Sequence, residues 1–125
     1  IKRMVKDLEF AVEIIPCPII REEDGLAVSS RNAYLSPAER RAALVVPESL
    51  SRAREAIGRG RRDASVIKDL VMQELLQEPL ARVDYVEVVD AAELKPVAEI
   101  GGPVVVAVAG FIGKTRLIDN FYGEV

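Results

Sequence analysis

The sequence predicts an α+β fold, in which a hairpin of two helices packs on a small, mainly antiparallel three-stranded sheet. Apolar residues recur at helical spacing up to about residue 76, and after residue 80 the period changes to that of β-strands. A tight Gly113-Lys114 turn between two apolar runs is typical of a β-hairpin. Of the 125 residues, 50% are hydrophobic and 30% are charged, which indicates a globular chain with an aliphatic core.

The first long helix has strong start signals. Ser36 is a predicted N-cap, Pro37 takes the first helical position, and Glu39 completes a capping box. The apolar stripe predicts a single helix over residues 37–57, which ends at the glycines that follow. Because Pro47 lies inside this range, we expect a kink there with one backbone hydrogen bond missing.

A second helix and three strands follow. Asp63 is the predicted cap of the second helix, which ends before Pro79. The β-branched and aromatic run Arg82–Asp90 predicts a strand. The almost wholly apolar run Pro103–Phe111 predicts the buried central strand, and Thr115–Asn120 leads into the last one.

The N-terminal residues have a pattern that differs from that of the two-helix and three-strand region. Ile1–Leu8 has helical spacing without an N-cap, so we expect this helix to begin upstream of Ile1. Phe10–Ile15 predicts a buried strand. Because a helix–strand unit of this kind closes a parallel α/β sheet, residues 1–20 are interpreted as the C-terminal remnant of a truncated nucleotide-binding domain, and residues 21–125 as a second domain. Alternatively, this strand joins the sheet of the second domain.

Composition excludes several functions. A net charge of −3 argues against a nucleic-acid-binding module, and no apolar run reaches the roughly 18 residues that span a membrane. A single cysteine predicts a cytoplasmic protein without disulfides, and without any histidine Cys17 is expected to be an inert structural thiol. Five arginines are expected to complement a helix C-terminus rather than bind nucleic acid: Arg52, Arg54, Arg59, Arg61 and Arg62.

The candidate functional element is residues 21–32, here called the Ser-Ser-Arg loop. Ser29, Ser30 and Arg31 offer two hydroxyls, backbone N–H groups and a planar guanidinium, the groups that bind phosphate. Gly25 would let the loop bend over a nucleotide as a lid. The alternative interpretation is a solvated turn whose serine and asparagine cap the following helix.

The segment Asp24–Leu35 resembles the D-G-L-x-x-S-S-R-N-x-Y-L motif of the pantothenate synthetase (pantoate–β-alanine ligase) family. Thr115–Asn120 is similar to the T-R-L-I-D-N motif near the end of that family's sequences. The two motifs occur in the same order, with helices between them. The resemblance covers essentially the whole chain, as the C-terminal lid domain of the enzyme.

The resemblance implies a cytoplasmic ligase of pantothenate biosynthesis, in the coenzyme A pathway. Such an enzyme has a Rossmann-like N-terminal domain and condenses (R)-pantoate with β-alanine through a pantoyl adenylate, using ATP with Mg²⁺ and releasing AMP and pyrophosphate. It implies a homodimer for the full-length enzyme, and no nucleic-acid or membrane partner. Pantoate and β-alanine would be bound mainly by the N-terminal domain.

Site residues follow from the match by position. Ser29, Ser30 and Arg31 would bind the ATP phosphates and stabilise the adenylation transition state, with Val28 beside the nucleotide. The backbone at Ile20 would contact the adenine. The family's N-terminal histidine pair and its lysine, aspartate and glutamine segment are missing from this sequence. We therefore expect this chain to have no ligase activity by itself.

Two other functions remain open from the sequence. One is a non-catalytic interaction domain, in which the Ser-Ser-Arg loop is a surface turn. The other is a different ATP-dependent acid–amine ligase or nucleotidyltransferase with a similar phosphate loop. Asp119 and Asn120 could suggest a metal site, but an Asx turn at a strand end is favoured, so no metal ligand is predicted.

Overall fold

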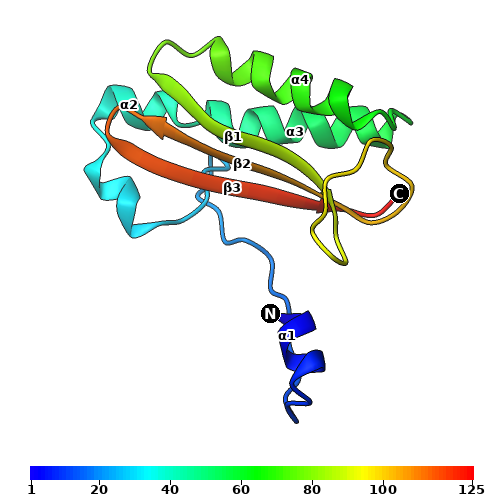
Figure 1. Cartoon of the computed structure of the whole chain (residues 1–125). Coiled ribbons are helices and arrows are strands. Elements are labelled where there is room, and N and C mark those ends of the chain that lie inside the picture. The colour runs from blue at the N-terminus through cyan, green and yellow to red at the C-terminus, as the bar shows by residue number, and fades with distance from the viewer.

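A computed structural model describes residues 1–125 and has an α+β architecture (Figure 1). Helices precede the strands, and a single 3₁₀-helix, η1, lies between α1 and α2. In chain order the elements are α1 (Lys2–Asp7), η1 (Ser30–Tyr34), α2 (Pro37–Ala42), α3 (Val45–Gly58), α4 (Ala64–Leu76), β1 (Ala81–Asp90), β2 (Val104–Ile112) and β3 (Thr115–Gly123).

The three strands form one antiparallel sheet in the order β1-β2-β3, with the apolar β2 in the centre as predicted. Ile112 pairs with Thr115, so Gly113 and Lys114 form the predicted two-residue turn. Gly113 has φ +58°, a left-handed conformation that glycine adopts without a steric penalty. The antiparallel three-stranded sheet is therefore confirmed.

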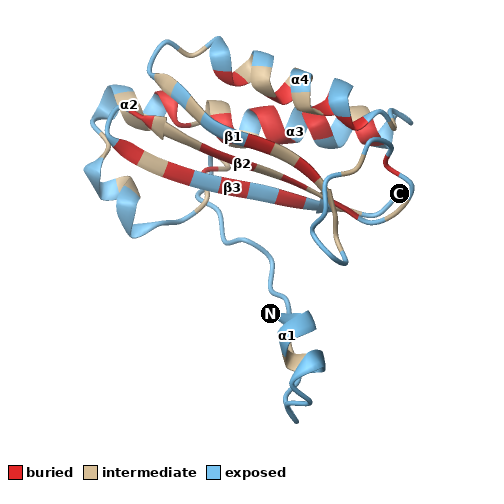
Figure 2. Cartoon of the chain, in the orientation of Figure 1, coloured by how far each residue is buried: buried red, intermediate tan, exposed pale blue.

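Helices α3 and α4 lie side by side on one face of the sheet (Figure 1). Val104, Val106 and Val108 of β2 are buried in the core that α3 and α4 form with the sheet. Figure 2 shows the buried residues concentrated between the helices and the sheet. The core is aliphatic apart from Phe121, as the composition predicts.

The prediction of one helix over residues 37–57 with a kink at Pro47 is wrong. The chain forms α2 and α3, separated at Ala43 and Leu44, upstream of the proline. Pro47 lies in the first turn of α3, where a backbone N–H has no intrahelical acceptor and its loss costs nothing. The capping box at the start of α2 is present as predicted.

The start of α4 also agrees with the sequence. The Asp63 side chain accepts hydrogen bonds from the backbone N–H groups of Ser65 and Val66. Near the end of α3, Arg62 donates to the carbonyl of Ile57 at 2.7 Å, as expected for a cation at a helix C-terminus.

The N-terminal segment departs from prediction. α1 is present, but Phe10–Ile15 forms no strand, its side chains are mostly exposed, and it does not join the three-stranded sheet (Figure 2). A strand needs the backbone of a neighbour to complete its hydrogen bonds, and these residues have none in the chain. α1 lies on the side of the sheet opposite α3 and α4 (Figure 1), where Arg3 pairs with Glu93 at 3.5 Å. No helix has both the length and the apolar composition needed to cross a membrane.

Candidate functional site

The first part of the Ser-Ser-Arg loop is a small backbone hairpin. Arg21 and Ala27 form an antiparallel bridge, and the N–H of Glu22 donates to the carbonyl of Leu26 at 2.8 Å. Gly25 completes the turn with φ +95°, a conformation that residues with a Cβ rarely adopt. Gly25 therefore fixes a tight turn in the loop.

The second part holds the three predicted phosphate ligands. Ser29 is the N-cap of η1, and its Oγ accepts a hydrogen bond from the N–H of Arg31 at 3.2 Å. Ser29, Ser30 and Arg31 are all exposed. The Arg31 guanidinium makes no hydrogen bond or ion pair within residues 1–125, so it is free to bind an anion. Capping by Ser29, the alternative role foreseen for this serine, is thus observed and leaves its hydroxyl exposed.

Contacts at the turn of this loop join it to α2 and to the apolar cluster beside the sheet. Leu26 is buried in a small cluster of apolar side chains at the α2 end of the sheet: Leu26, Ala42, Ala43, Ile112 and Leu117. Asp24 pairs with Arg40 of α2 at 2.9 Å, and this hydrogen-bonded pair lowers the pKa of the Asp24 carboxyl. The loop is therefore held at its turn as well as at its ends.

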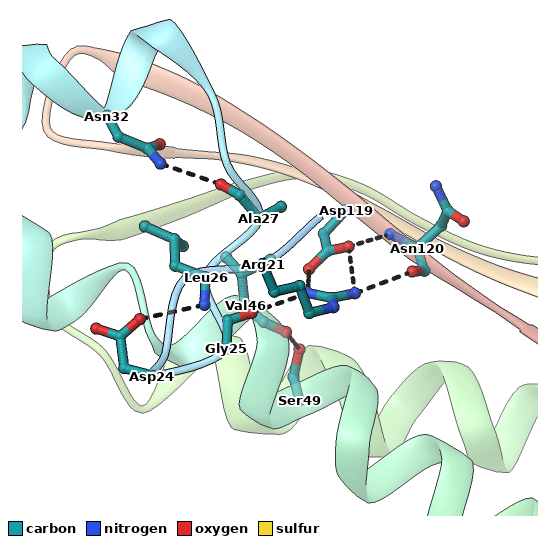
Figure 3. A network of polar contacts seen from close by, with 10 residues as sticks. All are labelled: Arg21, Asp24, Gly25, Leu26, Ala27, Asn32, Val46, Ser49, Asp119 and Asn120. Carbon is teal, nitrogen blue, oxygen red and sulfur yellow. Dashed lines mark hydrogen bonds and ion pairs between the residues drawn. The ribbon is translucent and has the colours of Figure 1, made fainter. Parts of the chain in front are cut away.

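Asn32 closes the loop from the other side. Its Nδ2 donates to the carbonyl of Ala27 at 3.0 Å, which connects η1 to the backbone hairpin (Figure 3). Its Oδ1 is buried without a hydrogen-bond partner in the chain. A buried acceptor without a partner costs about 1–3 kcal/mol, so this conformation of Asn32 is maintained by its surroundings.

The strongest polar contact of the site joins Arg21 to Asp119. The two guanidinium nitrogens donate to the two carboxylate oxygens at 2.7 and 2.9 Å (Figure 3). The Asp119 side chain is 2% exposed and that of Arg21 32%. Hydrogen bonding to Asp119 raises the pKa of Arg21, so the guanidinium stays charged.

This pair was not predicted from the sequence. Asp119 lies within β3 rather than at a strand end, so the prediction of an Asx turn is wrong. Its carboxylate, which a metal ion would need as a ligand, is hydrogen-bonded to the guanidinium of Arg21. The available signal was the alternation along β3, where Thr115, Leu117, Asp119 and Phe121 all face inward. An acidic residue among inward-facing positions requires a cationic or hydrogen-bonding partner.

Two of the cavities that residues of the loop line adjoin each other. One, here called the Ser29 cavity, has a volume of about 340 Å³ and is lined by Val28, Ser29, Arg31, Asn32, Arg116 and Asp119, among others. The other, here called the Arg54 cavity, has a volume of about 520 Å³ and is lined by Cys17, Arg21, Arg54, Asn120 and Tyr122, among others. Both are lined by Ile19 and Asn120, so they adjoin each other.

The structure brings together most of the predicted site. Val28, Ser29 and Arg31 share the Ser29 cavity, whereas Ser30 and Ile20 line neither cavity and are exposed. Ile20 is joined to the loop through its carbonyl, which accepts from the N–H of Val28 at 2.9 Å. Cys17, expected to be a structural thiol, is exposed at the rim of the Arg54 cavity.

The acidic side chains form no metal site. Nowhere do three or more acidic or cysteine side chains gather in a way that could hold a metal ion. Asp119, the one carboxylate of the Ser29 cavity, is already paired with Arg21. These residues do not form a Mg²⁺ site by themselves, because such a site needs free carboxylates together with ligand or water oxygens.

Comparison with known proteins identifies the family. The family model described as pantoate-beta-alanine ligase matches residues 1–122. The chain belongs to the pantoate–β-alanine ligase family. The resemblance of the two sequence motifs to this family is thereby confirmed, and it extends beyond them to nearly every residue.

Individual members of the pantoate–β-alanine ligase family agree. A pantothenate synthetase of Clostridioides difficile (strain 630) is 55% identical over 125 residues, which cover 100% of this chain and 44% of the relative. A crystal structure of pantothenate synthetase from Thermus thermophilus matches with a TM-score of 0.88 and 40% identity, over 96% of this chain and 43% of that one.

A third relative adds ligands. The pantoate–β-alanine ligase of Francisella tularensis, complexed with beta-gamma ATP and β-alanine, matches with a TM-score of 0.58 and 26% identity, over 96% of this chain and 37% of that one. The chain thus spans less than half the length of the relatives it matches.

Proposed function

We propose that this chain is the C-terminal domain of a pantothenate synthetase, which condenses (R)-pantoate with β-alanine using ATP. The observation that carries the proposal is the placement of Val28, Ser29 and Arg31 on one cavity wall, in a chain of the pantoate–β-alanine ligase family. The beta-gamma ATP and β-alanine in the Francisella tularensis complex support both ligands. The loop residues act on the nucleotide.

The proposed reaction has two steps. A pantoate carboxylate oxygen attacks the α-phosphorus of ATP, and the bond from that phosphorus to the pyrophosphate oxygen breaks, giving pantoyl adenylate. The neutral amine of β-alanine then attacks the acyl carbon and loses a proton, while the acyl C–O bond to AMP breaks. Because the first nucleophile is already a carboxylate, that step needs no general base, and a chain without histidine can serve it.

The Ser-Ser-Arg loop acts on the leaving group. Negative charge grows on the pyrophosphate as its bond to the α-phosphorus breaks. A guanidinium and hydroxyls that lie beside it stabilise this charge more than they stabilise bound ATP. Arg31 suits this role because its guanidinium has no partner within the chain, and Ser29 because its hydroxyl is exposed. Ser30 belongs to the same group by its match to the motif.

The nucleotide contacts follow the same geometry. Val28 lines the Ser29 cavity, and the carbonyl of Ile20 is already bound to the N–H of Val28. We place the nucleotide along this pair, with residues 1–20 as the remnant of a Rossmann-like domain and residues 21–125 as the lid domain. Gly25, with its left-handed φ, is the point about which the loop bends.

The remaining parts of the proposal concern the whole enzyme. Mg²⁺ would accompany ATP, and the side chains of this chain would not hold it. Pantoate and β-alanine are bound mainly by the N-terminal domain of a homodimer. A cytoplasmic location suits an exposed unpaired thiol, which persists in a reducing compartment.

The test is pantoate-dependent exchange of labelled pyrophosphate into ATP, measured on the full-length enzyme and on the 125-residue chain. We expect exchange and pantothenate formation by the full-length enzyme only. Replacing pantoate by other hydroxy acids separates this function from another acid–amine ligase. A full-length enzyme that binds no ATP, with unshifted amide signals at residues 28–31 during an ATP·Mg²⁺ titration, would instead indicate a non-catalytic interaction domain.

A further inference from the structure

We propose that Arg21 and Asp119 are positioning residues for ATP, which hold the Ser-Ser-Arg loop against β3 and keep the wall of the Ser29 cavity free of negative charge. This inference rests on the proposed function, because it concerns how the same loop receives the triphosphate. Neither residue belongs to the phosphate-binding triplet.

The contacts of Arg21 span both sides of the site. Its guanidinium donates to both Asp119 carboxylate oxygens, to the carbonyl of Gly25 at 2.9 Å and to the carbonyl of Asn120 at 3.5 Å (Figure 3). Gly25 and Asp119 belong to different elements, since Gly25 is in the turn of the loop and Asp119 is in β3. One side chain therefore fixes the turn of the loop on a strand of the sheet.

The position of this contact determines what it holds. Arg21 begins the backbone hairpin that ends at Ala27, and the following N–H, of Val28, is bound to Ile20. Val28 and Ser29 come next in the chain and line the cavity. Moving Arg21 away from β3 would therefore move the residues that face the nucleotide.

The burial of Asp119 gives the pair a second role. A carboxylate that is 2% exposed is strongly destabilised without a cationic partner. Asp119 also lines the Ser29 cavity, together with Arg31. Without Arg21, an uncompensated negative charge would lie where a triphosphate must bind. Arg21 is thus needed to let the positive charge of Arg31 dominate the wall.

The other arginine of the cavity cannot replace Arg21. Arg116 donates to the carboxylate of Asp84 at 2.9 and 3.1 Å, so its guanidinium already has another carboxylate as its partner. Buried ion pairs are weak evidence for stability, and their better-attested use is to fix one arrangement of the chain. The Arg21–Asp119 pair has that character, since it joins residues that lie 98 positions apart.

The experiment uses the full-length enzyme with Arg21→Met, Asp119→Asn and the double variant. Arg52→Met is the matched control, because Arg52 also pairs across two elements, with Glu74 at 2.7 Å, but away from the loop. The readouts are KM for ATP, KM for β-alanine, and amide exchange at residues 28–31 without nucleotide.

We expect Arg21→Met to raise KM for ATP about 10- to 100-fold, the scale of losing a charged hydrogen bond, and to leave KM for β-alanine within about threefold. Amide exchange at Val28 and Arg31 should rise with it. Adding Asp119→Asn should recover part of the loss in KM for ATP, because it removes the uncompensated charge, and the part that remains reports the loss of the contact between the loop and β3. Arg52→Met should change neither KM by more than about threefold.

An Arg21→Met enzyme with KM for ATP within about threefold of wild type would overturn the inference, and a double variant no better than Arg21→Met would overturn the charge role. If Arg21→Met does not fold, Arg21→Lys replaces it as the test. A lysine cannot make the bidentate contact with Asp119, so Arg21→Lys should still raise KM for ATP more than about threefold. A wild-type enzyme that forms no pantothenate overturns the proposed function instead. The positioning role is then judged by amide exchange alone, and unchanged exchange in Arg21→Met rejects it.

Discussion

The carboxylate of Glu39 occupies the space that a Cβ on Gly113 would fill. The same carboxylate accepts a hydrogen bond from the N–H of Ser36 at 2.8 Å, as half of the capping box of α2. The helix start and the β2–β3 turn therefore meet at one side chain. This contact connects two elements that the sequence presents as independent local signals.

Replacing Gly113 by alanine should destabilise the fold by about 1–3 kcal/mol. The new Cβ displaces Glu39 from Ser36, and alanine at φ +58° is strained besides. Urea denaturation of the 125-residue chain measures the change. Gly102→Ala is the control, because its Cβ meets no atom within 4 Å, and it should change stability by less than about 0.5 kcal/mol.

A double variant separates the two causes. In a Glu39→Ala background the clash is gone, so Gly113→Ala should cost only the backbone strain, about 1–2 kcal/mol. An equal cost in both backgrounds would show that Glu39 plays no part.

Arg31→Ala in the full-length enzyme should lower the rate of adenylation by about 100-fold or more, the scale of losing one donor to a transition-state charge. Pyrophosphate exchange measures this step directly. Arg41→Ala, at an exposed arginine of α2, is the control and should retain the wild-type rate. An unchanged rate in Arg31→Ala would contradict the assignment of the loop.

Ile67→Ala should destabilise the chain by about 2–5 kcal/mol, because Ile67 is fully buried between α4 and the sheet and its truncation leaves a cavity. The neighbouring Val66 is 38% exposed, so Val66→Ala should cost less than about 1 kcal/mol. Thermal and urea unfolding of the 125-residue chain measure both. Equal losses for the two variants would mean that α4 packs by another face.

The stability of the chain should fall at acid pH. The carboxylate of Asp90 accepts hydrogen bonds from the N–H groups of Glu93, Lys95 and Ala92, which lower its pKa below the unfolded value of 3.8. The stabilisation is fully present above that unfolded value and disappears as the pH falls through the folded pKa. Protonation then weakens all three bonds.

Asp90→Asn tests the origin of this effect. The variant should be less stable than wild type at pH 7, and the difference measured by urea denaturation should be smaller at about pH 2. Asp69→Asn, at an exposed carboxylate without hydrogen bonds or ion pairs, is the control and should behave as wild type. A difference for Asp90→Asn that is the same at both pH values would exclude titration as the cause.

Local signals predicted most of the elements correctly. The capping box at Ser36, the Asp63 cap and the two-residue turn at Gly113 all form as expected. Each depends on residues within three or four positions of one another, so a short stretch of sequence is enough to determine it. The antiparallel pairing of β2 with β3 follows because a two-residue turn joins them.

Predictions that needed a distant partner failed. Phe10–Ile15 has the composition of a strand, yet without a neighbouring backbone it forms no strand and stays exposed. The single helix expected over residues 37–57 also failed, for a local reason: α2 ends at Ala42 and α3 begins at Val45. Pro47 has no N–H to donate to the carbonyl of Ala43, four residues before it, and that carbonyl accepts from Val46 instead. Proline then falls in a first turn, where it is tolerated.

In the Ser-Ser-Arg loop, too, local features were predicted from the sequence and long-range contacts were not. The sequence alone predicted the phosphate-binding residue types of this loop and its likeness to the pantoate–β-alanine ligase family. This was possible because phosphate recognition depends on hydrogen-bond donors that lie close together in the chain. The tertiary structure alone decided what holds these donors in place. Arg21 and Asp119 stand 98 positions apart, and only the packing of the loop against β3 makes one buried carboxylate the partner of that guanidinium.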